Sequence, residues 1–227
     1  MLDAHTHRPK RTQGLIEIES PDIRLVREGN WQPTGPFVLG LHPWWIGQMA
    51  EPLETLFSWM EHPECLGVGE TGLDKLISTS LETQIFWFLK HLDLAKTYKK
   101  SLVVLHIVRS WSELKPILRQ SKYEGKILLH DCQASAGDLK WLETDERLWF
   151  SYGSALKKKT SRGFQGFLEA PAGKVLFETD DSGEDIENTV RMGLGFRPEV
   201  PYAENSYRFL KAVGYPCVSG KVCADPK

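Results

Sequence analysis

The sequence predicts an α/β fold, and within that class a (β/α)8 barrel of the TIM type, from three observations. Eight short apolar runs rich in Val, Ile, Leu and Phe recur along the 227 residues, a length near the lower limit for such a barrel. From residue 37 onward these runs alternate with segments of helical periodicity, which is the order of parallel βα units. Several runs are continuously apolar, as parallel strands covered on both faces are. An open doubly wound sheet is the alternative architecture.

The elements can be justified in order along the chain. We expect strands at 1–4, 15–19, 37–41, 65–69, 102–105, 126–129, 148–152 and 174–179. We expect helices at 51–61, 80–100, 109–121, 136–144, 161–169, 184–194 and 203–213. The gap "HTHRPKRTQG" between the first two strands is too short for a helix, and the next gap carries Pro21, Pro33 and Pro36 and is mostly loop. The barrel is therefore expected to be trimmed or distorted in its first third.

Composition points to one domain over residues 1–227, with 41% hydrophobic and 26% charged residues. The net charge of −2 carries no sign of a bulk nucleic-acid binder, so any phosphate contact has to be local. No apolar run approaches the roughly 18 residues of a membrane span, and a "DxHxH" pattern from Asp3 leaves no room for a secretory signal. We expect a cytoplasmic protein with no membrane contact.

The four cysteines lack CxxC spacing and are interpreted as reduced thiols. Cys217 and Cys223 are close enough in sequence to pair if oxidised, but nothing in the sequence requires it.

Polar side chains follow most of the predicted strands, at the edge where barrels carry their active sites. Five of the seven histidines lie there, whereas His62 and His91 fall on helical segments and are expected at the surface. The residues at the strand ends are His5, His7, His42, Glu70, Asp74, His106, Arg109, His130, Asp131, Glu178, Asp180 and Asp181.

Imidazole and carboxylate ligands together favour Zn, Mn, Fe or Ni over a hard all-oxygen site. His5 and His7, at a spacing of two, share one face of a strand and can both point at one ion. A carboxylate can bridge two ions about 3.5–4 Å apart, and such a pair acidifies a bound water and polarises a phosphoryl or carbonyl oxygen.

Other chemistries fit the sequence less well. It contains neither a GxSxG elbow nor a Walker A loop. "GVGETG" meets GxGxxG by count, but it lies at the fourth strand and the next helix begins only near residue 80, which does not suit a dinucleotide-binding turn. A thiol nucleophile at Cys132 would need His130 as its base, and His130 is better explained as a metal ligand.

Several motifs in order resemble the TatD family of metal-dependent deoxyribonucleases, within the amidohydrolase-like barrels. They are "DAHTH", "GLHPWW", "GVGETGLDK", "QIFWFLKHLDLAK" leading into "LVVLH", "ILLH", "FSYG" and "VLFETDDS". They extend from residue 3 to about 182, and "AENSYRFL", with Asn205, is similar to the last helix of the family.

The resemblance implies two divalent metal ions, with Zn, Mn and Mg as the candidates. It implies that His5 and His7 bind the first ion, that Glu70 bridges both, and that His106 and His130 bind the second. Asp180 would bind the first ion and accept the proton of the attacking water. All six of these residues are also among those at the predicted strand ends.

Other residues receive supporting roles. His42 is similar to a histidine of the family that contacts substrate or supports the ligands, and packing under Trp44 and Trp45 is the equal alternative. Asp74 and Glu178 are expected to orient metal ligands, with Glu178 alternatively capping its strand end, whereas Asp181 is expected at a helix cap or in solvent.

The chain departs from the family pattern near the substrate. The arginine usually found two residues after the fifth-strand histidine comes at three here, as Arg109, and "HDCQASAG" replaces an aromatic and a small-residue turn. The run Lys157–Lys159 could attract a phosphate backbone, although a solvated charge run is the more common situation. Trp31, Trp44, Trp45 and Trp111 could stack on bases, and packing is favoured for most of them.

The sequence thus predicts a metal-dependent hydrolase that cleaves phosphodiester bonds, a TatD-like DNase acting on DNA ends or single strands. The first alternative is a small-molecule amidohydrolase or esterase on the same dinuclear site. The second is a non-enzymatic metal-binding or interaction protein, against which six intact ligands weigh. The sequence does not indicate the oligomeric state.

Overall fold

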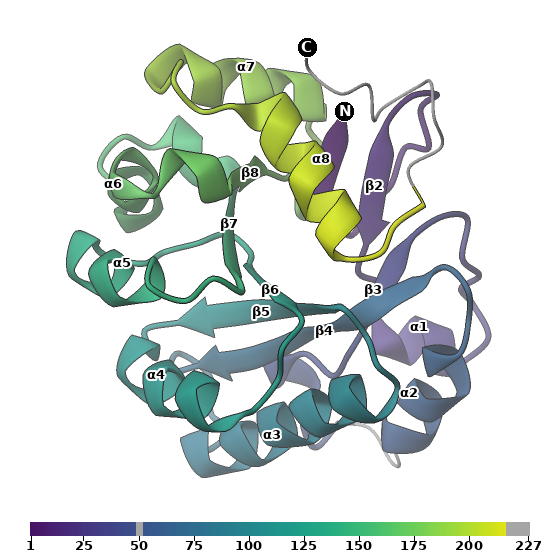
Figure 1. Cartoon of the computed structure of the whole chain (residues 1–227). Coiled ribbons are helices and arrows are strands. Elements are labelled where there is room, and N and C mark those ends of the chain that lie inside the picture. Colours follow the sequence, from purple (N-terminus) through teal and green to yellow (C-terminus); the bar gives the residue numbers. More distant parts are fainter. Residues whose placement is uncertain (49–51, 217–227) are drawn as a thin grey trace.

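Eight parallel strands form one sheet in chain order, and the sheet curls into a nearly closed barrel with helices outside it (Figure 1). The computed structural model describes residues 1–48 and 52–216. The strands are β1 (Leu2–Thr6), β2 (Ile16–Glu19), β3 (Phe37–Leu39), β4 (Cys65–Asp74), β5 (Leu102–Val108), β6 (Lys126–Leu129), β7 (Leu148–Tyr152) and β8 (Val175–Phe177). The (β/α)8 prediction is confirmed. Cys217 and Cys223 lie outside the described residues.

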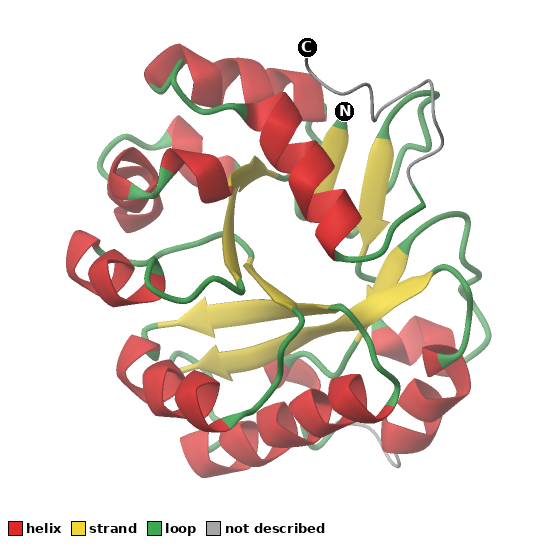
Figure 2. Cartoon of the chain, viewed as in Figure 1, coloured by secondary structure: helices red, strands yellow, loops and turns green. Residues whose placement is uncertain are grey.

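The helices alternate with the strands from β3 onward (Figure 2). They are α1 (Ile23–Arg27), α2 (Pro52–Met60), α3 (Leu81–Thr97), α4 (Trp111–Gln120), α5 (Ala136–Leu142), α6 (Arg162–Glu169), α7 (Ile186–Phe196) and α8 (Tyr202–Ala212). Three 3-10 turns accompany them: η1 (Pro43–Trp45), η2 (Ser154–Lys157) and η3 (Ala172–Lys174). None of these helices is long and apolar enough to cross a membrane, within the residues described.

The first third of the barrel is reduced, as predicted. A loop alone connects β1 to β2, and the connection from β2 to β3 contains only the five-residue α1, in a gap predicted to be mostly loop. Asp22 caps α1, its side chain accepting the backbone N–H of Arg24.

The barrel closes between β1 and the residues that follow β8. The backbone N–H of Asp180 donates to the carbonyl of His5 at 3.0 Å, and the N–H of His7 donates to the carbonyl of Asp180 at 3.1 Å. The buried carboxylate of Asp3 adds a side-chain link, accepting from the backbone N–H of Thr179 at 3.0 Å and from its hydroxyl at 2.5 Å. The first strand and the last are therefore joined at the residues on which the predicted metal site depends.

Two apolar clusters hold the barrel. The larger one lies between the strands and the outer helices and includes Val103 and Leu105 of β5. The smaller one contains Leu102 and Val104, the alternate residues of the same strand, together with Phe209 of α8. Since successive side chains of a strand point to opposite faces, the smaller cluster fills the barrel interior. His106 follows Val104 on that inner face.

Two strands are irregular where they carry predicted ligands. The register between β1 and β2 shifts between Asp3 and Thr6, and that between β4 and β5 shifts between Val68 and Thr71. The shifted segments contain His5 and Glu70 respectively. Bulges of this kind re-aim side chains and occur beside active sites.

The glycines of "GVGETG" have a packing role. A Cβ on Gly72 would lie 2.1 Å from the carbonyl oxygen of His106, and Gly72 has a φ of +144°. Glycine is therefore required for β4 to pair this closely with β5.

One expectation about histidines was wrong. His91 is fully buried within α3, where its Nδ1 lies 2.7 Å from the carbonyl of Trp87, and its Nε2 accepts the backbone N–H of Leu41 at 2.8 Å. His62 lies just after α2, not within it, and is partly buried.

Candidate active site

The six predicted ligands converge at the carboxyl ends of the strands, around the buried side chain of Glu70. Its Oε2 lies 3.3 Å from Nε2 of His5 and 3.2 Å from Nε2 of His7. Its Oε1 lies 2.5 Å from Nε2 of His130 and 3.4 Å from Nδ1 of His106. The two carboxylate oxygens thus face two separate pairs of histidines, one at the end of β1 and the other on β5 and just after β6.

Asp180 completes the first side of this cluster. Its Oδ1 lies 3.6 Å from Nε2 of His5 and 3.3 Å from Nε2 of His7. Its backbone is left-handed, with a φ of 51°, a conformation that aspartate tolerates better than most residues and that is often retained at functional sites. Asp181 forms an exposed ion pair with Arg8 at 2.8 Å.

Hydrogen bonds to the remote ring nitrogens determine which nitrogen can bind a metal. Nδ1 of His7 donates to the carbonyl of Ser20 at 2.6 Å, so Nε2 is the nitrogen that faces Glu70 and Asp180. Nε2 of His106 donates to Oδ2 of Asp74 at 3.3 Å, which leaves the lone pair of Nδ1 facing Glu70. Asp74 therefore orients a predicted ligand in the manner of a carboxylate–histidine–metal triad.

His42 has the opposite arrangement. Its Nδ1 accepts the backbone N–H of Trp44 at 3.1 Å, so in the neutral ring the proton is on Nε2, 3.4 Å from Oε1 of Glu70. Burial lowers the pKa of His42, which favours this neutral form. Although His42, Glu70 and His106 lie close enough to hold an ion, the Nε2 of His42 is a hydrogen-bond donor and has no lone pair to offer.

The cluster is electrostatically coupled. Burial opposes ionisation of Glu70, but the imidazoles of His130 and His5 outweigh it and hold the pKa of Glu70 well below its usual range. Burial also opposes protonation of His7, yet hydrogen bonds to Asp180 and Glu70 raise its pKa to about 10. The carboxylates are therefore anionic and attract cations into the cluster.

The residues fit divalent metal ions. Two overlapping groups, His5 with His7 and Glu70, and His5 with His130 and Asp180, have ligand atoms within 4.8 Å of one another. His5 is fully buried, and neither of its ring nitrogens makes a hydrogen bond. Such a group is costly to bury unless its lone pair has a partner, and a metal ion would supply one.

Two buried acids, Glu178 and Asp3, form hydrogen bonds with residues next to the cluster. Glu178 accepts the backbone N–H of Asp131 at 2.7 Å and the hydroxyl of Ser151, and its Oε1 lies 3.7 Å from Nδ1 of His130. Asp3, for which the sequence offered no role beyond the family pattern, holds Thr179 next to Asp180. Its signal was available in the sequence, because it precedes His5 by two residues.

A cavity of about 490 Å³ opens over the cluster. Its inner surface carries Glu70, Asp180, His7, His42, His106 and His130. Its outer wall is formed by α1 and η1, through Pro21, Ile23, Leu25, Trp44 and Trp45. The volume is in the usual range for a small-molecule or nucleotide site.

Two predicted substrate residues do not line this cavity. Arg109 lies in a neighbouring depression of about 740 Å³, together with Arg162. Lys157 forms an ion pair with Glu184 at 2.6 Å. Lys159 lies over the ring of Phe196, 5.1 Å from its centroid.

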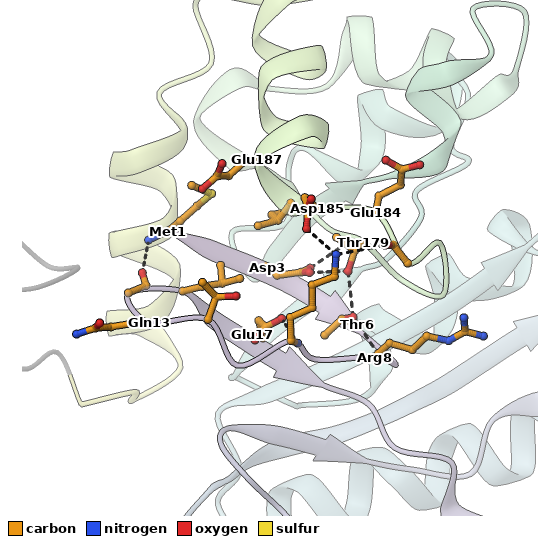
Figure 3. Close-up of a pocket in the computed structure, with 16 residues that line it drawn as sticks. Met1, Asp3, Thr6, Arg8, Gln13, Glu17, Thr179, Glu184, Asp185 and Glu187 are labelled. Carbon is orange, nitrogen blue, oxygen red and sulfur yellow. Dashed lines mark hydrogen bonds and ion pairs between the residues drawn. The ribbon is translucent and has the colours of Figure 1, made fainter.

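A second cavity, of about 300 Å³, lies between the β1–β2 loop and the segment after β8 (Figure 3). Asp3, Thr6 and Thr179 are linked there by hydrogen bonds, and Lys10 pairs with Asp185 at 2.5 Å (Figure 3). Glu17 accepts the backbone N–H groups of Lys10 and Arg11 in the adjoining loop. The acids named here are therefore already paired, and their bonds connect β1, the β1–β2 loop and the segment after β8.

Comparison with known proteins gives consistent results. A family model described as "TatD related DNase" matches residues 24–192. The solved structure of YjjV, a TatD homologue from Escherichia coli K12, superposes with a TM-score of 0.74 at 20% identity, covering 93% of this chain and 95% of that one. A TatD-family hydrolase from Entamoeba histolytica gives a TM-score of 0.61 at 15% identity, covering 79% and 73%. No curated protein sequence gives a significant match.

Proposed function

Because this chain belongs to the family of TatD-related DNases, we propose that it is a metal-dependent phosphodiesterase that acts on DNA ends or single strands. The family and fold support a hydrolase. The finer assignment to phosphodiester bonds of DNA is the proposal. The two-sided contact of Glu70 with two histidine pairs carries it, because one carboxylate between two sets of ligands is the arrangement of a bridged dinuclear centre.

We assign His5, His7 and Asp180 to a first ion and His106 and His130 to a second, with Glu70 placed to contribute to both. Divalent ions held there would acidify a water molecule and stabilise negative charge on phosphoryl oxygens.

The protein's own groups perform the proton transfer and the positioning. Asp180 is half-exposed to the cavity while Glu70 is buried, with side-chain exposures of 31% and 4%, so Asp180 is the carboxylate able to accept the proton of the attacking water. His42, with its proton on Nε2, donates a hydrogen bond to an oxygen of the substrate or to Glu70.

The test is an activity screen with Mg²⁺, Mn²⁺ and Zn²⁺ on single-stranded DNA, RNA, a simple phosphodiester and a carboxylic ester. Asp180→Asn should lower kcat by about 10²- to 10⁴-fold. Asp93→Asn is the control, because Asp93 lies on α3, paired with Lys96 at 2.7 Å, and does not line the cavity. Undiminished hydrolysis by Asp180→Asn would rule out the proposed base.

The ligand assignment has its own measurement. His5→Ala protein should lose bound metal, measured by elemental analysis of purified, folded protein. Unchanged stoichiometry at both positions would refute the assignment.

A small-molecule amidohydrolase or esterase is the second candidate. The absence of Arg109 and Lys157 from the cavity lining, together with its apolar outer wall, favours it. The same screen decides: cleavage of the carboxylic ester without cleavage of any phosphodiester would establish this alternative.

A further inference from the structure

The outer wall of the cavity contains an exposed tryptophan. Eight large apolar side chains are exposed in the described part of the chain, and two of them, Trp44 and Leu25, line the cavity, with exposures of 50% and 46%. Exposed apolar surface concentrated at one side of a pocket marks a binding surface more often than a single exposed leucine does.

The rings of the other tryptophans discussed above are covered by other side chains or buried. The guanidinium of Arg24 lies 3.4 Å from the centroid of Trp45. Trp31 donates to Glu19 at 2.6 Å and packs edge-to-face on Phe37. Trp111 is buried on α4. In contrast, the rings near Trp44 meet it at interplanar angles of 77° to 84°, and no described cation lies over it.

Trp44 is also fixed in place. Its indole N–H donates to Oδ2 of Asp74 at 2.9 Å. Its carbonyl accepts the side chain of Gln48 at 2.8 Å, and its backbone N–H donates to His42 at 3.1 Å. A ring held in this way binds a flat partner with little further loss of conformational entropy.

The Trp44 ring lies close to the predicted metal cluster. The centroid of the Trp44 ring lies 4.8 Å from that of His42 and 5.9 Å from that of His106. A phosphodiester at the Glu70 cluster would therefore bring one of its own nucleosides against the α1–η1 wall.

We propose that Trp44 is a stacking surface for the nucleobase adjacent to the cleaved phosphodiester, so that the site takes nucleotides whose base is unpaired. This inference rests on the proposed phosphodiesterase function. A base within a duplex is paired and stacked on its neighbours, whereas one at a frayed end or in a single strand has a free face for an aromatic side chain.

The experiment compares a short single-stranded oligonucleotide with the same oligonucleotide carrying abasic residues. Binding is measured with Mn²⁺ by rapid mixing, before hydrolysis proceeds, and kcat and KM are measured with Mn²⁺ at steady state. The wild type should prefer the ordinary oligonucleotide by about 5- to 100-fold in Kd and in KM. Trp44→Ala should lose this preference while binding the abasic oligonucleotide as the wild type does.

Two further variants separate stacking from positioning. Trp44→Phe keeps an aromatic face but loses the N–H donor to Asp74, so it should retain most of the preference. Phe86→Ala is the matched control at an exposed aromatic side chain that does not line the cavity, and it should retain all of the preference. Metal content is measured in each variant, and Trp44→Ala should keep that of the wild type.

The outcomes are distinct. Equal binding of the two oligonucleotides by the wild type, or an equal loss for both in Trp44→Ala, would overturn the stacking surface. Hydrolysis of DNA without base preference would leave the phosphodiesterase in place and refute this inference alone. Base-dependent binding without hydrolysis under any metal would refute the phosphodiesterase and leave Trp44 as a surface that binds bases.

Discussion

At the scale of single residues, Asp74 illustrates how one carboxylate fixes two neighbouring side chains. Burial opposes its ionisation, but hydrogen bonds from His106 and Trp44 lower its pKa to about 2, so it accepts from both as an anion. Its other oxygen accepts the backbone N–H of Leu76 at 2.8 Å. The Nδ1 of His106 faces Glu70 because its Nε2 donates to this carboxylate.

Asp74→Asn should weaken binding of the second metal ion. The remaining carbonyl oxygen stays with Leu76, so the new NH₂ group faces Nε2 of His106 and shifts the ring proton to Nδ1, the nitrogen that faces Glu70. We expect about a 10- to 100-fold loss of affinity for one of two ions, measured by calorimetric titration with Mn²⁺.

Asp93→Asn is the control for that titration, because Asp93 lies on the exposed side of α3, paired with Lys96 at 2.7 Å. Two unchanged binding constants in Asp74→Asn would show that Asp74 does not orient a ligand.

At the scale of elements, α3 supports the turn that carries His42 and Trp44. His91 reaches from the buried side of α3 to the backbone N–H of Leu41, immediately before that turn. Burial lowers the pKa of His91 to about 4, against an ordinary value of 6.5. The folded protein therefore holds His91 neutral, whereas the unfolded chain protonates it below about pH 6.5.

His91 should make the protein less stable in mild acid. The pKa of His91 is lower in the folded protein than in the unfolded chain. The stability that the neutral His91 contributes is therefore fully present above about pH 6.5 and is lost as the pH falls toward 4. The slope is at most about 1.4 kcal/mol of unfolding free energy per pH unit, or about 3 kcal/mol in total.

His91→Gln removes the titrating group and keeps an acceptor for Leu41. Urea unfolding in EDTA between pH 7 and about pH 4.5 should show a shallower loss of stability in this variant than in the wild type. Parallel curves would contradict the assignment of the slope to His91.

At the scale of the whole molecule, positive charge is local, as the net charge of −2 implies. Arg109 and Arg162 are exposed in the depression beside the cavity, and neither forms an ion pair with any described residue. Lys157 is neutralised by Glu184. The two arginines are therefore the better candidates for contacts with phosphates that flank the cleaved bond.

Arg109→Gln with Arg162→Gln should reduce the salt dependence of DNA binding. Each arginine that neutralises a phosphate of a single strand contributes about 0.7 to the slope of log K against log salt, so the double variant should lose about 1.4. Fluorescence anisotropy with a labelled oligonucleotide over a range of KCl concentrations measures this. Lys157→Gln is the control, and an equal change in that variant would favour the lysine run instead.

Much of the architecture could be predicted because parallel strands are buried on both sides and leave continuous apolar runs. The run "KILL" coincides with β6, and "LWFSY" with β7. The expectation for 65–69 was too short, since β4 extends to Asp74 through "ETGLD", whose polar residues face the site and hide the strand. The short α1 was missed because prolines flank it on both sides.

The sequence by itself determined the fold class, the family and the six candidate ligands, because ligands at strand ends leave a local record in residue type and spacing. Only the tertiary structure decided which nitrogen of each histidine faces Glu70, that His42 donates, and that His91 is buried. Those properties arise from contacts with Ser20, Asp74, Trp44 and Leu41, which lie 2 to 50 residues away in the chain. Only the fold distinguishes the roles of Trp44 and Trp45, because Arg24 of α1 covers the ring of Trp45 and leaves that of Trp44 exposed.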